Sequence, residues 1–140
     1  MSFNVRGLVG SLKINSLKRM INNHKPSVIL FKETMLEGIK AHEVLEKILK
    51  YWSFTHINAD GHSGGLTKAW SLALKESKIC KLDNVLKTVL KDNTTGEAFA
   101  ILNVYRPYHN CRTFWENIAS SQLWEDRNMV IGGDLNLTVS

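Results

Sequence analysis

The segment Ser27–Phe31, SVILF, constrains the fold more than any other part of the chain. It is apolar at every position after its serine, without the alternation of a strand that has one wet face. Such an unbroken run is typical of a strand in a sheet that is covered on both faces. Because amphipathic segments precede and follow it in the chain, the sequence predicts an α/β protein.

Helices are expected where apolar residues recur at helical spacing. The expected helices and their apolar faces are segment 12–24 with Leu12, Leu17, Met20 and Ile21, segment 38–50 with Ile39, Val44, Leu45, Ile48 and Leu49, and segment 113–123 with Phe114, Trp115, Ile118 and Leu123. The expected strands are 3–5, 27–31, 53–57, 66–74, 78–90, 97–105 and 129–131. Segment 58–65 is expected to be a loop, segment 91–96 a hairpin turn, and Gly132-Gly133 a turn after the last strand.

Length and composition indicate one domain, residues 1–140, with a hydrophobic core. Of its 140 residues, 44% are hydrophobic and 22% charged, as is ordinary for a globular protein. The formal net charge of +5 favours a polyanionic partner such as nucleic acid, although a solvated basic surface would give the same count. The sequence contains no signal peptide and no apolar run of ~20 residues, and Cys80 and Cys111 lack metal-ligand spacing. We therefore expect an intracellular chain with reduced thiols and no membrane contact.

Four polar residues share one placement, at or just after the end of an expected strand; they are Asn4, Glu33, Tyr105 and Asp134. Strand ends of layered α/β proteins gather along a rim where ligands commonly bind. Asp134 and Asn136 are two residues apart, so in extended backbone they point to the same side and suit a shared phosphate. Each residue also has a plain structural reading, since Asp and Asn after Gly-Gly are turn formers and a tyrosine before a loop can be a half-buried ring. The order of these residues along the chain favours the functional interpretation over the structural one.

Five motifs follow one another along the chain: FNVRGL, VILFKETML, HSGGL with Trp70, LNVYRPY with FWENI, and VIGGDLNLT. In this order, from Ser2 to Ser140, the chain resembles the endonuclease/exonuclease/phosphatase superfamily. It is most similar to the endonuclease domain of LINE-type retrotransposons, particularly the plant kind. The resemblance implies a four-layer sandwich of two β-sheets flanked by helices. It also implies a phosphodiesterase that acts on DNA in the nucleus with Mg²⁺ or Mn²⁺.

The resemblance also assigns roles to the residues at the strand ends. Glu33 matches the family's metal-binding glutamate, and a carboxylate is a ligand that Mg²⁺ prefers. Asn4 matches the asparagine that helps to organise the metal site, and Tyr105 matches the tyrosine that contacts the scissile phosphate. Asp134 matches the aspartate that aligns or deprotonates the attacking water, and Asn136 matches a neighbour that holds the phosphate. In such a reaction a metal neutralises developing charge while fixed donors hold the phosphate in line.

The chain departs from the family's pattern at several positions. Lys32 stands where a glutamine is usual, so its ammonium either competes with Mg²⁺ or extends away to solvent. Val9 looks inserted in the loop after NVRG, and Lys68 interrupts the apolar strand after Ser-Gly-Gly. A further aspartate and a late Asp-His pair of the family have no counterpart here. This implies a domain that is truncated at its C-terminus, with part of an apolar sheet face left exposed.

Several functions are compatible with these features. The chain is expected to be a nicking DNA endonuclease domain in truncated form, inactive as 140 residues alone. The alternatives are a non-catalytic nucleic-acid-binding or functionless remnant, and a phosphatase-type member of the same superfamily.

Overall fold

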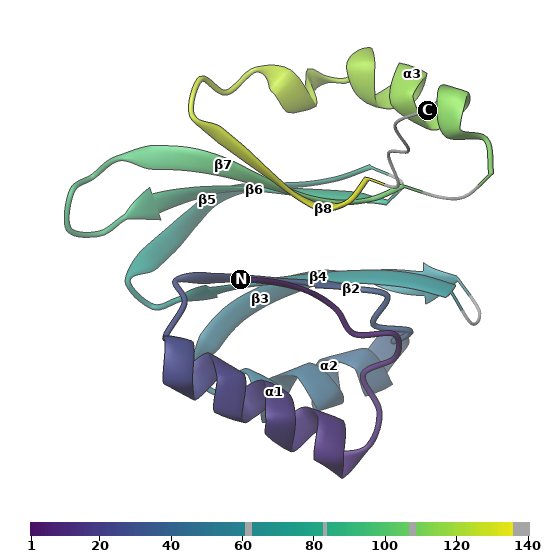
Figure 1. Ribbon diagram of the computed structural model, residues 1–140. Helices are drawn as coiled ribbons and strands as arrows, with labels where there is room; N and C mark the ends of the chain where they lie inside the picture. Colours follow the sequence, from purple (N-terminus) through teal and green to yellow (C-terminus); the bar gives the residue numbers. More distant parts are fainter. Residues whose placement is uncertain (61–62, 83, 107–108, 136–140) are drawn as a thin grey trace.

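The computed structural model describes residues 1–60, 63–82, 84–106 and 109–135. Within these ranges two four-stranded sheets face each other, with helices on both outer faces (Figure 1). The four layers are a pair of helices, the first sheet, the second sheet and a third helix. The predicted α/β sandwich of two sheets flanked by helices is therefore confirmed.

The first sheet has the strand order β1-β2-β4-β3. Its strands are β1 Ser2–Asn4, β2 Val28–Lys32, β3 Trp52–Asp60 and β4 Ser63–Ser71. Strands β1 and β2 are parallel and are joined by helix α1, Ser11–His24, while the other pairs are antiparallel. Helix α2, Gly38–Ile48, lies beside α1 on the same outer face (Figure 1).

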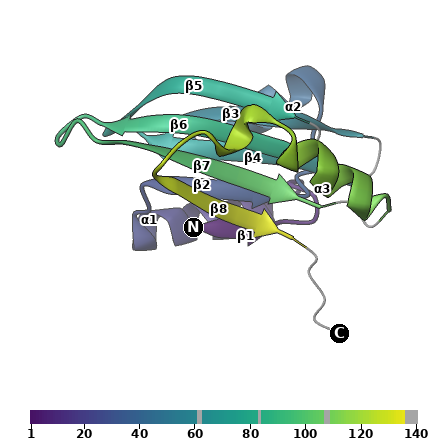
Figure 2. The same ribbon diagram turned by 90° about the horizontal axis from the view of Figure 1, so that it is seen from above.

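The second sheet has the strand order β5-β6-β7-β8. Its strands are β5 Leu74–Leu82, β6 Val85–Asp92, β7 Ala98–Tyr105 and β8 Met129–Asp134. Strands β7 and β8 are parallel and are joined through helix α3, Cys111–Ala119, and the 3-10 turn η1, Gln122–Trp124. Figure 2 shows β8 at one edge of the second sheet, above β1 at the edge of the first.

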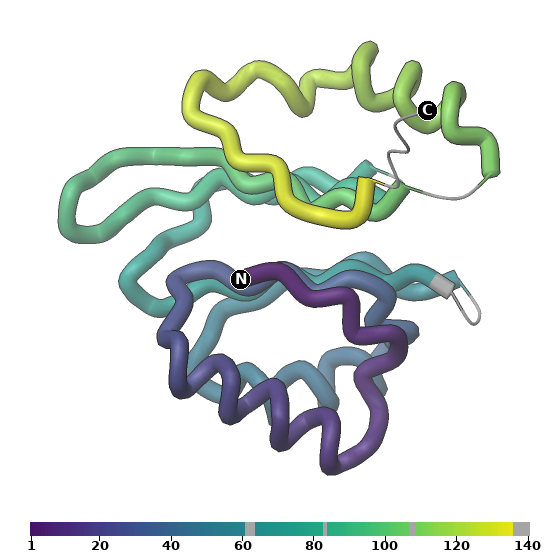
Figure 3. The backbone as a smooth tube through the Cα atoms, viewed as in Figure 1, coloured from purple at the N-terminus to yellow at the C-terminus, as the bar shows by residue number. Residues whose placement is uncertain are grey.

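The two sheets are joined by one short crossing. Strand β4 ends at Ser71 and β5 begins at Leu74, so only Leu72 and Ala73 link them. The trace in Figure 3 follows this link from the first sheet up to the second. Residues before the link build the first sheet and its helices, and residues after it build the second sheet and α3.

The core is divided by the alternation of side chains along the strands. In β2, Ile29 and Phe31 pack against α1 and α2, whereas Leu30 packs against the second sheet. In β7, Leu102 and Val104 pack under α3, whereas Ile101 faces the first sheet. Both central strands are thus buried on both faces, as the apolar run of β2 predicts.

The predicted helices are present, but their apolar faces are narrower than expected. Leu17 and Ile21 of α1 and Leu45 and Ile48 of α2 are buried, as predicted. Leu12 is 84% exposed and Ile39 is 81% exposed, so their assignment to the buried faces is wrong. Leu12 precedes Leu17 by five residues and so lies about 140° around the helix from it, because each residue advances ~100°. Met20 lies at the border of the buried face, 39% exposed.

Four of the predicted turns and strands need correction. The expected loop 58–65 is largely strand, because β3 runs to Asp60 and β4 starts at Ser63. The expected strand 78–90 is two antiparallel strands, since Leu82 pairs with Val85. The expected strand 66–74 ends at Ser71, because residues 72 and 73 turn the chain into β5 of the other sheet. Gly132-Gly133 continue β8 instead of turning the chain. The hairpin at 91–96 is confirmed, with Asp92 Oδ1 accepting the N–H groups of residues 94 and 95.

Candidate active site at the strand ends

Glu33 directly follows β2, in a loop that hydrogen bonds hold on two sides. Its own backbone has φ 52°, in the left-handed region that non-glycine residues seldom adopt. Gly7 N–H, in the loop after β1, donates to Glu33 O at 2.7 Å, and Leu8 N–H donates to Thr34 O at 2.9 Å. On the other side Thr34 N–H donates to Gly65 O at 3.2 Å. The loop is therefore fixed, and so is the carboxylate that it presents.

The second glycine of the SGG motif packs closely against this loop because it has no side chain. A Cβ on Gly65 would lie 2.3 Å from Thr34 Oγ1, so no larger residue fits without moving the Glu33 loop. Gly64 and Gly65 both have positive φ, 79° and 85°. Glycine at these positions therefore lets β4 approach the loop that carries Glu33.

Tyr105, the last residue of β7, reaches Glu33 from the opposite sheet. Its hydroxyl donates to Glu33 Oε1 at 2.8 Å, and its side chain is almost fully buried. Two predicted site residues, 72 positions apart in sequence, are thus in direct contact at the rim. A hydroxyl bonded to a carboxylate fixes the orientation of both groups.

Asp134 ends β8 beside Tyr105. The two residues pair in the parallel register, and Arg106 N–H donates to Asp134 O at 2.9 Å. A Cβ on Gly132 would lie 2.5 Å from Leu30 Cδ1 of the first sheet. Gly132 therefore faces the first sheet, and Asp134, two residues on, lies on that same inner face. The Gly-Gly pair is needed for close approach and not for a turn.

Asn4 and Lys32 are register partners at the end of the β1–β2 pair. Phe3 packs toward the helices, so Asn4 lies on the inner face, where it is exposed at the rim. Lys32 lies on the inner face too, because Leu30 of the same strand faces the second sheet. It is only 8% exposed, so most of its side chain is buried at this rim. Its competition with a metal at Glu33 stays a prediction.

The predicted site is thus brought together in large part. Four side chains share the inner rim, and Glu33 and Tyr105 are in contact. Asn136 lies outside the described residues, and so does His62, the other side chain that the sequence places near a phosphate. One residue that sequence reasoning missed is Asn103, which appears only as a polar break in the apolar strand AFAILNVY.

Two of the buried polar side chains of inner strands bond across the sandwich. Lys68 of β4 is fully buried, and its Nζ donates to Leu86 O at 2.8 Å and to Ile101 O. Asn103 of β7 is fully buried too, and it donates to carbonyl oxygens of the first sheet. Burial between the sheets lowers the pKa of Lys68 from 10.5 to about 7. The interruption at Lys68 therefore links the sheets and does not break the strand.

Lys13 braces the loop after β1. Its Nζ donates to Val5 O at 2.9 Å, to Gly7 O at 2.8 Å and to Arg6 O at 3.3 Å. Through Gly7, this loop is bonded to Glu33 O. Lys13 therefore supports the site's backbone, and its charge is already engaged by carbonyl oxygens.

The residues at the rim fit a cation that is coordinated mainly by water and substrate. Among the residues that the structure describes, no three His, Cys, Asp or Glu side chains gather into a metal-binding group. Mg²⁺ does not require such a cage, since it is usually held by one or two carboxylates together with water and substrate phosphate. Glu33, with Asn4 and Asp134 on the same inner face, fits that kind of binding.

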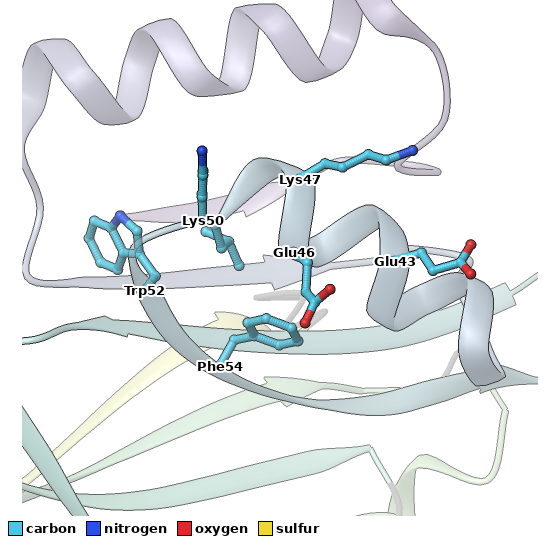
Figure 4. A pocket seen from close by; sticks show the side chains of 7 residues that line it. Glu43, Glu46, Lys47, Lys50, Trp52 and Phe54 are labelled. Carbon is cyan, nitrogen blue, oxygen red and sulfur yellow. The ribbon is translucent and has the colours of Figure 1, made fainter.

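A separate hollow lies between α2 and β3, at the other end of the first sheet (Figure 4). It measures about 540 Å³. Its lining residues are Glu43, Glu46, Lys47, Leu49, Lys50, Trp52 and Phe54. Trp52 pairs with Ser71 in β4, whereas the Glu33 end of β2 pairs with Leu66. The hollow is therefore remote from the rim and contributes nothing to the site.

The sandwich is the fold of the endonuclease/exonuclease/phosphatase family. No family model and no curated protein matches the sequence. Among solved structures, a mannosyl-6-phosphatase of Bacteroides thetaiotaomicron is 12% identical and superposes with a TM-score of 0.73 over 96% of this chain and 64% of its own. An AP endonuclease of Leishmania major is 18% identical, with a TM-score of 0.67 over 97% of this chain and 54% of its own.

A third structure of this fold is D. rerio TDP2 in complex with a single-strand DNA product. It is 15% identical and has a TM-score of 0.65 over 99% of this chain and 60% of its own. The chain thus spans 54% to 64% of the length of the three proteins. Nuclease-type and phosphatase-type proteins therefore share this fold.

Proposed function

We propose that the chain is part of a divalent-metal-dependent phosphodiesterase that nicks DNA, in the manner of a LINE-type retrotransposon endonuclease domain. The contact between Tyr105 Oη and Glu33 Oε1, at 2.8 Å, is the observation that supports it most directly. It joins a carboxylate and a hydroxyl from opposite sheets at the rim where Asn4 and Asp134 also lie. Such a convergence of polar groups at strand ends is typical of a ligand site.

In this proposal each rim residue has one task. Glu33 would hold Mg²⁺ or Mn²⁺, with Asn4 organising the same corner, and Tyr105 would orient Glu33 and contact the scissile phosphate. Asp134 would align the attacking water or accept its proton, and Asn136 would hold the phosphate. The metal, when bound, would neutralise charge that develops on the phosphate.

Charge and fold both support DNA as the substrate. The formal net charge is +5, and phosphate contacts dominate protein–DNA affinity. Not all of the basic residues are available, because Lys13 and Lys68 are bonded to carbonyl oxygens and Lys87 pairs with Asp126 beneath α3. The solved neighbour with a DNA product supports nucleic acid as the substrate class. Action on genomic DNA would place the protein in the nucleus.

The test is nicking of supercoiled plasmid by the chain within its full-length parent protein. We expect nicking with Mg²⁺ or Mn²⁺ and none with EDTA. Glu33→Ala and Asp134→Ala should each lower the rate roughly 100-fold or more, which corresponds to about 3 kcal/mol of transition-state stabilisation. Glu43→Ala, an exposed carboxylate on α2, is the matched control and should nick like wild type. Undiminished nicking by both rim variants would remove these residues from the mechanism.

The 140-residue chain by itself is expected to show no specific cleavage, because active-site charges act as a unit and the resemblance implies further site residues. Steady Mg²⁺-dependent turnover that disappears in Asp134→Ala would contradict this. Inactivity of the parent protein as well, with DNA binding retained, would favour a non-catalytic remnant.

A phosphatase is the second candidate, because a sugar phosphatase shares the fold with a TM-score of 0.73. Release of inorganic phosphate from a sugar phosphate, without any plasmid nicking, would select it over the endonuclease.

A further inference from the structure

The space between the two sheets contains two polar side chains that bond across it in opposite directions. Lys68 of the first sheet donates to two carbonyl oxygens of the second. Asn103 of the second sheet donates through Nδ2 to Phe31 O at 3.1 Å and to Thr67 O at 3.2 Å in the first. Both side chains are 0% exposed. We call Lys68 and Asn103 the clasp.

Asn103 lies one step inward from the candidate active site on the same two strands. It precedes Tyr105 by two residues in β7, and Phe31 precedes Glu33 by two residues at the end of β2. The contacts Asn103–Phe31, at 3.1 Å, and Tyr105–Glu33, at 2.8 Å, are therefore successive links between the same parts of the two sheets. A slide of β7 along β2 that stretched the first would stretch the second.

Sheets packed face to face share no ladder hydrogen bonds, so side chains alone set their relative position. Apolar contacts are non-directional and change little when one sheet slides slightly over the other. An N–H···O bond is directional and is lost when its atoms separate beyond normal bonding distance. The amide of Asn103 therefore restricts a slide that the surrounding leucines permit.

We propose that Asn103 is a positioning residue of the site. Its amide holds β7 against β2 so that the Tyr105 hydroxyl reaches the Glu33 carboxylate. Asn103 acts only through these two residues and is not placed to touch a substrate. The inference rests on the proposed function only in that the Glu33–Tyr105 pair is taken to be the working part of the site.

The test uses the full chain in solution, with the through-space NMR contact between the Tyr105 ring and the Glu33 side chain as the readout. Asn103→Leu keeps the approximate volume of the side chain and removes its donors. Ile118→Val, on the buried face of α3 and away from the clasp, is the control for a general loss of stability. Thermal midpoints of all variants are measured in the same buffer.

We expect Asn103→Leu to keep a folded amide spectrum but to lose the Tyr105–Glu33 contact, while Ile118→Val keeps the contact. Retention of the contact at wild-type intensity in Asn103→Leu would overturn the proposal. If Asn103→Leu fails to fold, Asn103→Ala replaces it in the test. Alanine removes the same amide and does not introduce a branched side chain. Unfolding of both variants would also overturn it, because Asn103 would then hold the fold and not the site.

A second readout separates this inference from the proposed function. Mn²⁺, added to the wild-type chain, is expected to broaden the resonances of residues around Glu33. In Asn103→Leu the same broadening should require more Mn²⁺. No broadening in the wild type, with the NMR contact still dependent on Asn103, would refute metal binding at Glu33 in this chain and leave the positioning role intact.

Discussion

Replacing Lys68 with methionine tests the cost of holding an ammonium group between two sheets. Methionine is about as long as lysine and carries no charge, so Lys68→Met fills the space and removes the proton-binding group. Lys68 is 0% exposed, and burial lowers its pKa from 10.5 to about 7. The variant should therefore change the way in which stability depends on pH.

The sign follows from proton binding in the two states. Between pH 7 and pH 10.5 the unfolded chain keeps the proton on Lys68 and the folded protein has lost it. Unfolding then takes up a proton, so the free energy of unfolding rises with pH by about 1.4 kcal/mol per pH unit. From pH 7 to pH 10 the gain is about 4 kcal/mol, a large share of the ~5–15 kcal/mol of a typical domain. Below pH 7 both states are protonated, and this contribution is flat.

The hydrogen bonds from Lys68 to Leu86 O and Ile101 O favour the ammonium form and make that gain an upper value. Urea unfolding followed by tryptophan fluorescence, at five pH values from 6 to 10, measures it in wild type, Lys68→Met and the exposed-lysine control Lys78→Met. We expect the wild type to gain stability over Lys68→Met as pH rises above 7, and to run parallel to Lys78→Met. Parallel curves of stability against pH for the wild type and Lys68→Met would refute the lowered pKa of Lys68.

Three further predictions concern packing, the open sheet edge and DNA. Gly133→Ala should lower the free energy of unfolding by about 3 kcal/mol or more, measured by thermal unfolding, because the new Cβ would lie 2.0 Å from Val104 O. Gly96→Ala is the control and should cost about 1 kcal/mol, because its new Cβ would have no atom nearer than 3.9 Å. Val130 is 59% exposed on edge strand β8, and we expect this edge to make the chain prone to association. Val130→Lys should therefore raise the soluble fraction and leave the thermal midpoint unchanged. Equal solubility of the variant and the wild type would show that this edge does not cause association. DNA binding by the chain should be independent of sequence and should weaken steeply between low and moderate salt in fluorescence anisotropy, whereas a flat response would make the basic surface a solubility feature.

Much of the fold could be predicted because apolar patterning reports burial directly. The unbroken run of β2 predicted a strand buried on both faces, and it packs against helices on one side and the second sheet on the other. Leu12 and Ile39 were misplaced because an apolar side chain in a first helical turn looks the same in sequence whether or not it faces the sheet. The expected exposed inner face of the second sheet is confined to the β8 edge, at Val130, since the inner faces of β6 and β7 are covered by the first sheet.

The site was predictable residue by residue but not as an arrangement. Glu33, Tyr105 and Asp134 follow apolar runs, so their place at strand ends could be read from the sequence. That Tyr105 bonds to Glu33 depends on how two sheets dock, which no local pattern encodes. Asn103 was missed for the same reason, because its partners are backbone oxygens of the other sheet. A backbone oxygen accepts a hydrogen bond whichever residue carries it, so the sequence does not reveal such a partner.

The single crossing at Leu72–Ala73 divides the chain into two halves, each of which forms one sheet. Each sheet is built from consecutive strands, so its ladder is completed within its own half, and only Leu72 and Ala73 connect the two sheets along the chain. Glu33 lies in the leading half and Tyr105 in the trailing one. During synthesis the leading half emerges from the ribosome whole before any strand of its partner sheet exists. A reporter of the Glu33–Tyr105 contact would therefore register the docking of the two halves, in the manner of a split protein whose signal appears only on reassembly.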